Sequence, residues 1–316
     1  RATTGVNRAY MPGILDDSLR LVNFTAACGP VIYNGALFAP EYEGNAFVAE
    51  PSANLIKRNI LQTDGYMING RQAYSGREFL RSTDERFRPV NLYNGPDGAL
   101  YIVDMYRGII QHKTYLTPYL KNEIRERSLT QPLSYGRIYK VVPVKAKPKN
   151  VILPDDPVQL VRFLANRNGW VRSMAQQTIV DAGDLHIVPA LRELLKNPSE
   201  PLPLIHALWT LEGLGALQKE DVLPLLKLPE WDLRMQALAV SHSVINKENY
   251  RDFVQAFNNL IDDEQAAPYI AFLAGDIQPA DPFSYRRLVE DLVKKYADNT
   301  YVSDALISTM KDQEDS

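Results

Sequence analysis

Residues 86–112, RFRPVNLYNGPDGALYIVDMYRGIIQH, carry the clearest fold signal in this chain. Residues 94–98 predict a tight turn, because glycine adopts positive φ at little cost and proline presets a bend. Residues 90–93 predict a short strand before the turn. Residues 99–103 are almost wholly apolar and predict a second strand that is buried on both faces. The stretch therefore predicts a β-hairpin at the centre of the first half of the chain.

Polar side chains are concentrated on both sides of this hairpin. Arg86 and Arg88 lie two residues apart, so their side chains share one face if the first strand extends back to them. The end of the second strand and the predicted loop after it add further candidates for a pocket: Asp104, Tyr106, Arg107 and His112. This is the densest polar cluster of the sequence. We predict Asp104, Tyr106, Arg107 and His112 as candidate pocket residues.

An R-x-R pair followed by GPDGALY resembles the sugar- and sorbosone-dehydrogenase-like β-propellers, in which RIRDV precedes GPDGALY. The longer stretch RPVNLYNGPDGALYIVDMYRGIIQH is similar to one branch of these proteins, the membrane-bound dehydrogenases of the haem-binding propeller–HEAT type. Residues 25–30, TAACGP, and 44–51, GNAFVAEP, resemble later blades of the six-bladed ring. Since a blade takes about 40–45 residues, the resemblance implies half a propeller, with the missing N-terminal half supplied from outside this sequence.

The resemblance also implies a cofactor. In that family two arginines at the positions of Arg86 and Arg88 lie at pyrroloquinoline quinone (PQQ), whose carboxylates suit an arginine fork, so the resemblance implies that both residues bind the cofactor. The alternative is that they are surface arginines or arginines that bridge blades. Pro89 departs from the family pattern, which has an acidic residue there. Asp104 suits Ca²⁺ or an arginine, since carboxylates bind hard cations, but the capping of a turn or a pair with Arg107 is favoured. The family's catalytic histidine lies in earlier blades, so the catalytic residue is unknown here.

Composition excludes several other classes of protein. The 316 residues are 45% hydrophobic and 23% charged, as in an ordinary folded protein, and the net charge of −3 argues against a nucleic-acid binder. No apolar run approaches the ~20 residues that span a bilayer. Cys28 is the only cysteine, which excludes an intrachain disulfide, a cysteine-rich zinc site and a CxxCH haem motif. We expect Cys28 to be a small buried hydrophobic residue.

The hydrophobic period changes along the chain. Residues 1–143 predict β structure, with further strands at 47–49, 55–61 and 136–142. Residues 144–156, which include the basic run KAKPK, predict a linker. From residue 157 the period becomes helical. The predicted fold is therefore multidomain, all-β plus all-α: a partial β-propeller over 1–143 followed by a HEAT-like α-solenoid over 157–316.

Helix pairs recur throughout the second part, at 184–196 with 202–214, 220–228 with 232–244, 247–261 with 265–275, and 282–297 with 301–311. Ala175, Ala207 and Ala237 recur at intervals of 32 and 30 residues, at the position where one helix packs closely on the next. Short pairs of this kind resemble a compact HEAT array. We expect the histidines on these helices, such as His206 and His242, to be packed or solvated rather than catalytic.

Two functions are consistent with the sequence. The first is part of a periplasmic or exported, PQQ-dependent sugar or alcohol dehydrogenase-like quinoprotein, with Ca²⁺ as a further cofactor. It would pass electrons to a cytochrome c domain or protein, and its membrane association would come from a part outside this sequence. The second is a non-catalytic binding or scaffold subunit of a cell-envelope complex, with protein partners on the HEAT surface. Neither function involves nucleic acid.

Overall fold

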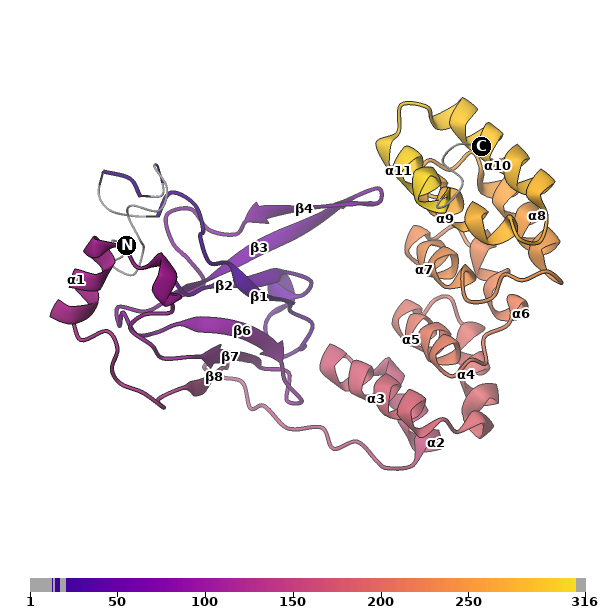
Figure 1. The fold of residues 1–316 in the computed structure, drawn as a ribbon. Coiled ribbons are helices and arrows are strands. Elements are labelled where there is room, and N and C mark those ends of the chain that lie inside the picture. The colour runs from indigo at the N-terminus through magenta and orange to yellow at the C-terminus, as the bar shows by residue number, and fades with distance from the viewer. Residues whose placement is uncertain (1–12, 14, 18–20, 311–316) are drawn as a thin grey trace. The chain divides into compact units, whose positions relative to one another are not determined.

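The computed structural model describes residues 13, 15–17 and 21–310 of the chain (Figure 1). The chain forms two compact units. The first comprises residues up to 152 together with 167–171, and the second comprises 153–166 together with the residues from 172 onward. Each unit has its own hydrophobic core, so each is described separately.

The first unit contains two antiparallel sheets. The larger has the strand order β1-β2-β3-β4, and β5 pairs with the start of β3. Its strands are β1 (Cys28–Ile32), β2 (Ala46–Glu50), β3 (Leu55–Asp64), β4 (Met67–Gln72) and β5 (Leu80–Arg81). The smaller sheet has the order β6-β7-β8. Its strands are β6 (Pro89–Asn94), β7 (Leu100–Asp104) and β8 (Arg137–Val141).

The predicted hairpin is confirmed as β6 and β7. Leu92 pairs with Ile102 and Asn94 with Leu100, so the turn lies over 95–99. Asp97 Oδ1 accepts the amide of Ala99 at 3.1 Å, and Gly98 has φ +79°. The turn chemistry visible in the sequence is therefore the chemistry that closes the hairpin.

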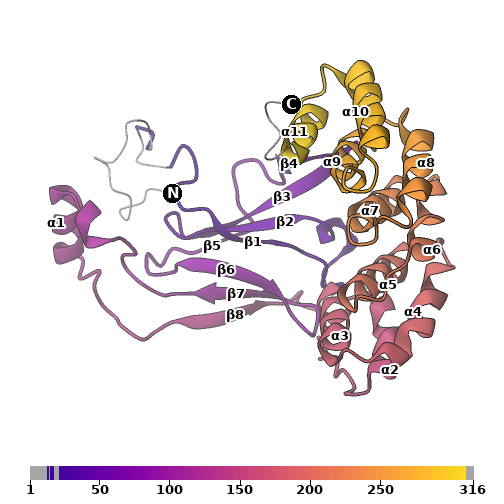
Figure 2. The same ribbon diagram turned by 45° about the vertical axis from the view of Figure 1, so that its right-hand side comes forward.

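Side chains from both sheets form one hydrophobic core. Figure 2 shows the two sheets one above the other. The buried members are Tyr33, Phe47, Ala49, Ile56, Phe87, Leu92, Leu100 and Ile102. The alternation of side chains along β6 and β7 sends Leu92 and Ile102 to the same face, where they meet the larger sheet. The hairpin is thus held by packing on the neighbouring sheet as well as by its own hydrogen bonds.

The prediction of a partial β-propeller in an all-β first domain is wrong. The described residues form two small sheets with no closed ring. They also include helix α1 (Pro118–Glu126), which begins after Thr117, whose Oγ1 accepts the amide of Leu120 at 3.3 Å. A capping threonine followed by proline is a local helix signal. Strand patterns predict antiparallel sheets, whereas ring closure depends on long-range packing that periodicity does not encode.

The second unit is helical and consistent with an α-solenoid. Figure 1 shows its helices in two rows, with α3, α5, α7, α9 and α11 in one and α2, α4, α6, α8 and α10 in the other. Their bounds are α2 Pro157–Leu160, α3 Gly169–Ala182, α4 Val188–Leu195, α5 Pro201–Gly213, α6 Lys219–Val222, α7 Trp231–Ser241, α8 Tyr250–Leu260, α9 Ala267–Ile277, α10 Pro282–Tyr296 and α11 Thr300–Thr309. The first three residues of α3 are assigned to the first unit.

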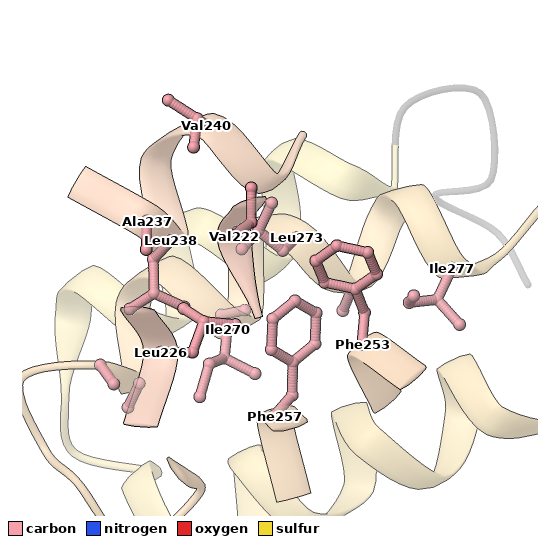
Figure 3. Packing of buried hydrophobic residues seen from close by; sticks show 14 of the residues in the cluster. Val222, Leu226, Ala237, Leu238, Val240, Phe253, Phe257, Ile270, Leu273 and Ile277 are labelled. Atoms are coloured by element: carbon pink, nitrogen blue, oxygen red, sulfur yellow. The ribbon is translucent and has the colours of Figure 1, made fainter. Parts of the chain in front are cut away.

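The repeat is visible in the packing of the helices. Ala175, Ala207 and Ala237 are fully buried, as their spacing predicts. Figure 3 shows the core around α7, α8 and α9, where the rings of Phe253 and Phe257 have centroids 6.1 Å apart. Helices of the two rows therefore pack their apolar faces against each other in two buried clusters, the arrangement by which repeat arrays are stabilised.

Candidate functional site

Arg88 immediately precedes β6 and is buried, with 5% of its surface exposed. Its three guanidinium nitrogens donate to backbone carbonyls: Nε to Arg107 at 2.9 Å, Nη1 to Pro51 at 2.6 Å and Nη2 to Gly108 at 2.7 Å. A buried guanidinium needs such acceptors, because leaving its donors unsatisfied is costly. Arg88 therefore joins the loop after β2 to the loop after β7, an arrangement that favours a structural role.

Asp104 ends β7 and is 1% exposed. Its Oδ1 accepts the amides of Arg88 at 2.7 Å and Tyr106 at 2.8 Å. This geometry matches the turn-capping alternative, since Tyr106 has φ +47° and a carboxylate stabilises the exposed amides of such a turn. Asp104 Oδ2 is buried and has no hydrogen-bond partner among the described residues.

Arg86 binds a different part of the backbone. Its Nε donates to the carbonyl of Gln131 at 3.0 Å, and its Nη2 to that of Arg127 at 3.3 Å. Its Nη1 lies 3.3 Å from a carboxylate oxygen of Glu85. The donors of Arg86 and Arg88 are thus directed to separate segments and do not converge on one ligand position. Their assignment to PQQ stays a prediction from resemblance.

The other predicted pocket residues contact their neighbours. The Tyr106 hydroxyl donates to Asp84 at 2.9 Å, and the Arg137 guanidinium lies 3.6 Å from the centre of the Tyr106 ring. His112 is exposed, and its Nδ1 accepts the amide of Thr114 at 3.3 Å. Arg107 contributes its carbonyl to Arg88. Among the described residues, no group of three or more His, Cys, Asp or Glu side chains is placed to hold a metal ion.

Sequence reasoning missed the buried carboxylate of Glu50. This side chain is fully buried at the end of β2, where Oε2 accepts the amides of Thr25 and Ala26, both at 3.1 Å, and Oε1 accepts that of Ser52. Burial raises the pKa of Glu50, although the three amides oppose the shift. Burial and the nearby Glu50 raise the pKa of the Cys28 thiol, which disfavours a reactive thiolate.

The second unit has an apolar groove of about 350 Å³ between α7 and α9. It is lined by Leu238, Ala239, Pro268, Tyr269, Phe272 and Leu273. Phe272 is 52% exposed, although its neighbour Leu273 is buried. The groove is therefore an opening at the surface of the helical core.

Side-chain contacts define both ends of this groove. At the end nearer the helix N-termini, the rings of Trp231 and Tyr269 meet edge to face with centroids 5.8 Å apart. At the other end, His242 Nδ1 lies 2.9 Å from the Asp276 carboxylate, and its ring centroid lies 6.2 Å from that of Phe272. Because helices fix these contacts, the groove exists before any ligand binds.

Hydrogen bonds link successive helices of the same row. His206 on α5 accepts at Nε2 from Arg172 Nε on α3, at 3.1 Å, and its Nδ1 lies 2.7 Å from Gln176 Oε1. Trp209 Nε1 donates to Gln236 Oε1 on α7 at 2.7 Å. Burial, together with the positive charge of Arg172, lowers the pKa of His206 to about 4. His206 is thus a neutral packed histidine, as the sequence predicts.

Within the described part of the chain, no helix is both long and apolar enough to cross a membrane.

Residues 6–145 match the model of a protein family described as a domain of unknown function (DUF7133). No curated protein matches the chain. The matched residues include the hairpin of β6 and β7 and amount to fewer than half of the 316 residues. The first unit therefore resembles this family, whose description names no activity.

Proposed function

We propose that this chain is a non-catalytic binding subunit whose helical array holds a segment of another protein. The observation that carries this proposal is the groove between α7 and α9, in which an apolar lining opens to solvent at the half-exposed ring of Phe272. Exposed aromatic side chains beside an apolar pocket are typical of anchor positions in protein interfaces. The expected occupant is a large apolar side chain on a short protein segment.

The construction of the groove supports this use. Its walls are two helices whose neighbouring side chains are already paired, Trp231 with Tyr269 and His242 with Asp276. A preformed site loses little conformational entropy when it binds, so more of the interaction free energy remains as affinity. Helical repeat arrays commonly present binding surfaces of this kind.

The test is a titration of the full chain with an uncharged peptide of Gly and Ser that carries a central Phe-Leu pair, followed by methyl NMR. Binding should shift the methyl signals of Leu238 and Leu273, which line the groove. The Phe272→Ala variant should lose this shift. Phe283→Ala on α10 is the matched control, because Phe283 is 75% exposed outside the groove and its loss should leave the shift unchanged. Methyl signals that do not move in the wild-type protein would overturn the proposal.

A sugar or alcohol dehydrogenase is the second candidate function. It is supported by the resemblance in residues 86–112, and the buried, unpartnered Oδ2 of Asp104 beside that hairpin is the observation that favours it. An exported location and a cytochrome c partner would follow from this function. The test is titration of the protein with PQQ and Ca²⁺: a saturable change in quinone absorbance that Asp104→Asn abolishes would support it. An absorbance that matches free quinone throughout would contradict it.

A further inference from the structure

The two rows of helices differ in charge. Helices α3, α5, α7, α9 and α11 together carry five acidic and two basic residues: Asp181, Glu212, Asp232, Asp276 and Asp304, with Arg172 and Arg234. Helices α2, α4, α6, α8 and α10 of the other row together carry seven basic and six acidic residues, so their charges nearly balance. The groove between α7 and α9 therefore opens on the acidic row.

Both basic residues of this row already have partners. Arg172 is buried and donates to His206 Nε2 at 3.1 Å and to the carbonyl of Asn166 at 2.6 Å. Arg234 Nη2 donates to Asp263 Oδ2 at 2.6 Å, and Nη1 donates to the carbonyls of Leu228 and Pro229 at 2.8 and 3.0 Å. Its side chain is 16% exposed. Arg234 thus leaves the negative potential of the row largely uncompensated.

Two of these carboxylates lie at helix C-termini, where an acid is unfavourable. Glu212 and Asp276 are in the last turns of α5 and α9, and no Lys or Arg lies in the last turn of α5, α7 or α9. The carbonyls at a helix C-terminus already carry partial negative charge, so an acid there is unfavourable. Ser243 Oγ donates to Glu212 at 2.9 Å, and His242 contacts Asp276, which brings the three helix ends to one edge.

We infer that the groove and this acidic edge together bind a basic protein segment. The inference rests on the binding function proposed above and specifies the chemistry of the partner. An apolar side chain occupies the groove beside Phe272, and a Lys or Arg of the same segment meets Asp276, with Glu212 at the same edge. Nucleic acids and anionic lipid surfaces are disfavoured occupants, because the acidic row repels them.

The spacing of the groove and the acid predicts a short motif. Asp276 follows Phe272 by one helical turn, which is about 6 Å along the axis. An extended peptide covers that distance in about two residues. The preferred segment therefore has an apolar residue, one intervening residue and then a Lys or Arg.

The experiment compares two labelled peptides that share a Phe anchor and differ in carrying Lys or Gln two residues after it. Affinity for the full chain is measured by fluorescence anisotropy at low salt. The Lys peptide should bind wild type roughly threefold to tenfold more tightly than the Gln peptide, the range expected for one or two solvent-exposed charge pairs. The double variant Glu212→Gln, Asp276→Asn should lose this preference.

The matched control removes two exposed acids from the other row, Glu193 on α4 and Asp291 on α10, as Glu193→Gln, Asp291→Asn. This variant should keep the full preference for Lys. If the control variant lost the preference for the Lys peptide to the same extent, the preference would come from the net charge of the protein alone, and the inference would be overturned. Equal affinities of wild type for the two peptides would also overturn it, while the groove-binding function would stand. If neither peptide shifts the methyl signals of Leu238 and Leu273, both proposals fail.

Discussion

Gly35 and Gly98 approach so closely that a Cβ atom on either residue would collide with the carbonyl oxygen of the other. The Tyr33 hydroxyl donates to the carbonyl of Gly98 at 2.7 Å and accepts the amide of Phe38 at 2.9 Å. Tyr33 is itself fully buried. The turn of the β6–β7 hairpin is therefore joined to the segment that follows β1 by contacts that leave no room for a side chain.

Replacing Gly98 with alanine should destabilise the first unit strongly. The residue has φ +79°, which costs an alanine about 1–2 kcal/mol, and the collision with the Gly35 carbonyl adds to this. Gly76→Ala is the control, because Gly76 has φ +69° with open space around its Cβ position. We expect urea denaturation to show a loss of about 1–2 kcal/mol in Gly76→Ala and at least twice that in Gly98→Ala. Equal losses would contradict the close approach.

Arg88→Lys should destabilise the protein by about 2–3 kcal/mol. Lysine cannot reproduce the planar arrangement by which Arg88 donates to three carbonyls, and a buried carbonyl without a donor is costly. Arg71→Lys on β4, where the side chain is exposed, should change stability by less than about 0.5 kcal/mol. Thermal unfolding of both variants makes the comparison. If the Arg88→Lys protein were as stable as Arg71→Lys, the structural role assigned to Arg88 would be contradicted.

The stability of the protein should decrease in mild acid because of His206. Its pKa is about 4 in the folded protein and about 6.5 when unfolded, so between these values the unfolded chain binds more protons. Stability is therefore complete above pH 6.5 and falls as the pH drops toward 4. Allowing for solvent screening of a half-buried ring, we expect a loss of about 1–2 kcal/mol between pH 7 and pH 5.

The measurement is urea denaturation at both pH values in wild type and in His206→Gln. The variant should lose that part of the pH dependence, since glutamine does not titrate. His186→Gln provides the control, because the His186 side chain is 96% exposed. A pH dependence identical in wild type and His206→Gln would show that another group is responsible.

Asp221 is expected to stabilise the α4–α6 contact. Its carboxylate is buried and accepts from Arg192 Nε at 2.9 Å and Nη2 at 3.1 Å, and it also accepts the amide of Gln218 at 3.0 Å. Asp221→Asn should therefore lower the free energy of unfolding by about 1.5–3 kcal/mol, because the NH2 group of the Asn side chain would face the N–H donors of Arg192 or Gln218. Asp252→Asn, which breaks the more exposed pair with Lys219, should cost less than about 1 kcal/mol in the same thermal unfolding assay.

Much of the local structure was predictable from the sequence, because short-range chemistry determines it. The turn over 95–99, the strands on either side of it and the helix pairs after residue 157 all follow from residue periodicity and from Gly, Pro and Asp at turn positions. The buried alanines at 175, 207 and 237 follow from their spacing.

The arrangement of the sheets and the roles of the polar residues were decided by tertiary structure. Strand periodicity is the same in a propeller blade as in the two stacked sheets found here, so the sequence pattern could not distinguish them. Arg86 and Arg88 look like a ligand fork in the sequence, yet their donors reach carbonyls about 20 to 45 residues away along the chain. The groove at Phe272 depends on how α7 and α9 are spaced. Such contacts join residues that are distant in sequence, and only the folded chain brings them together.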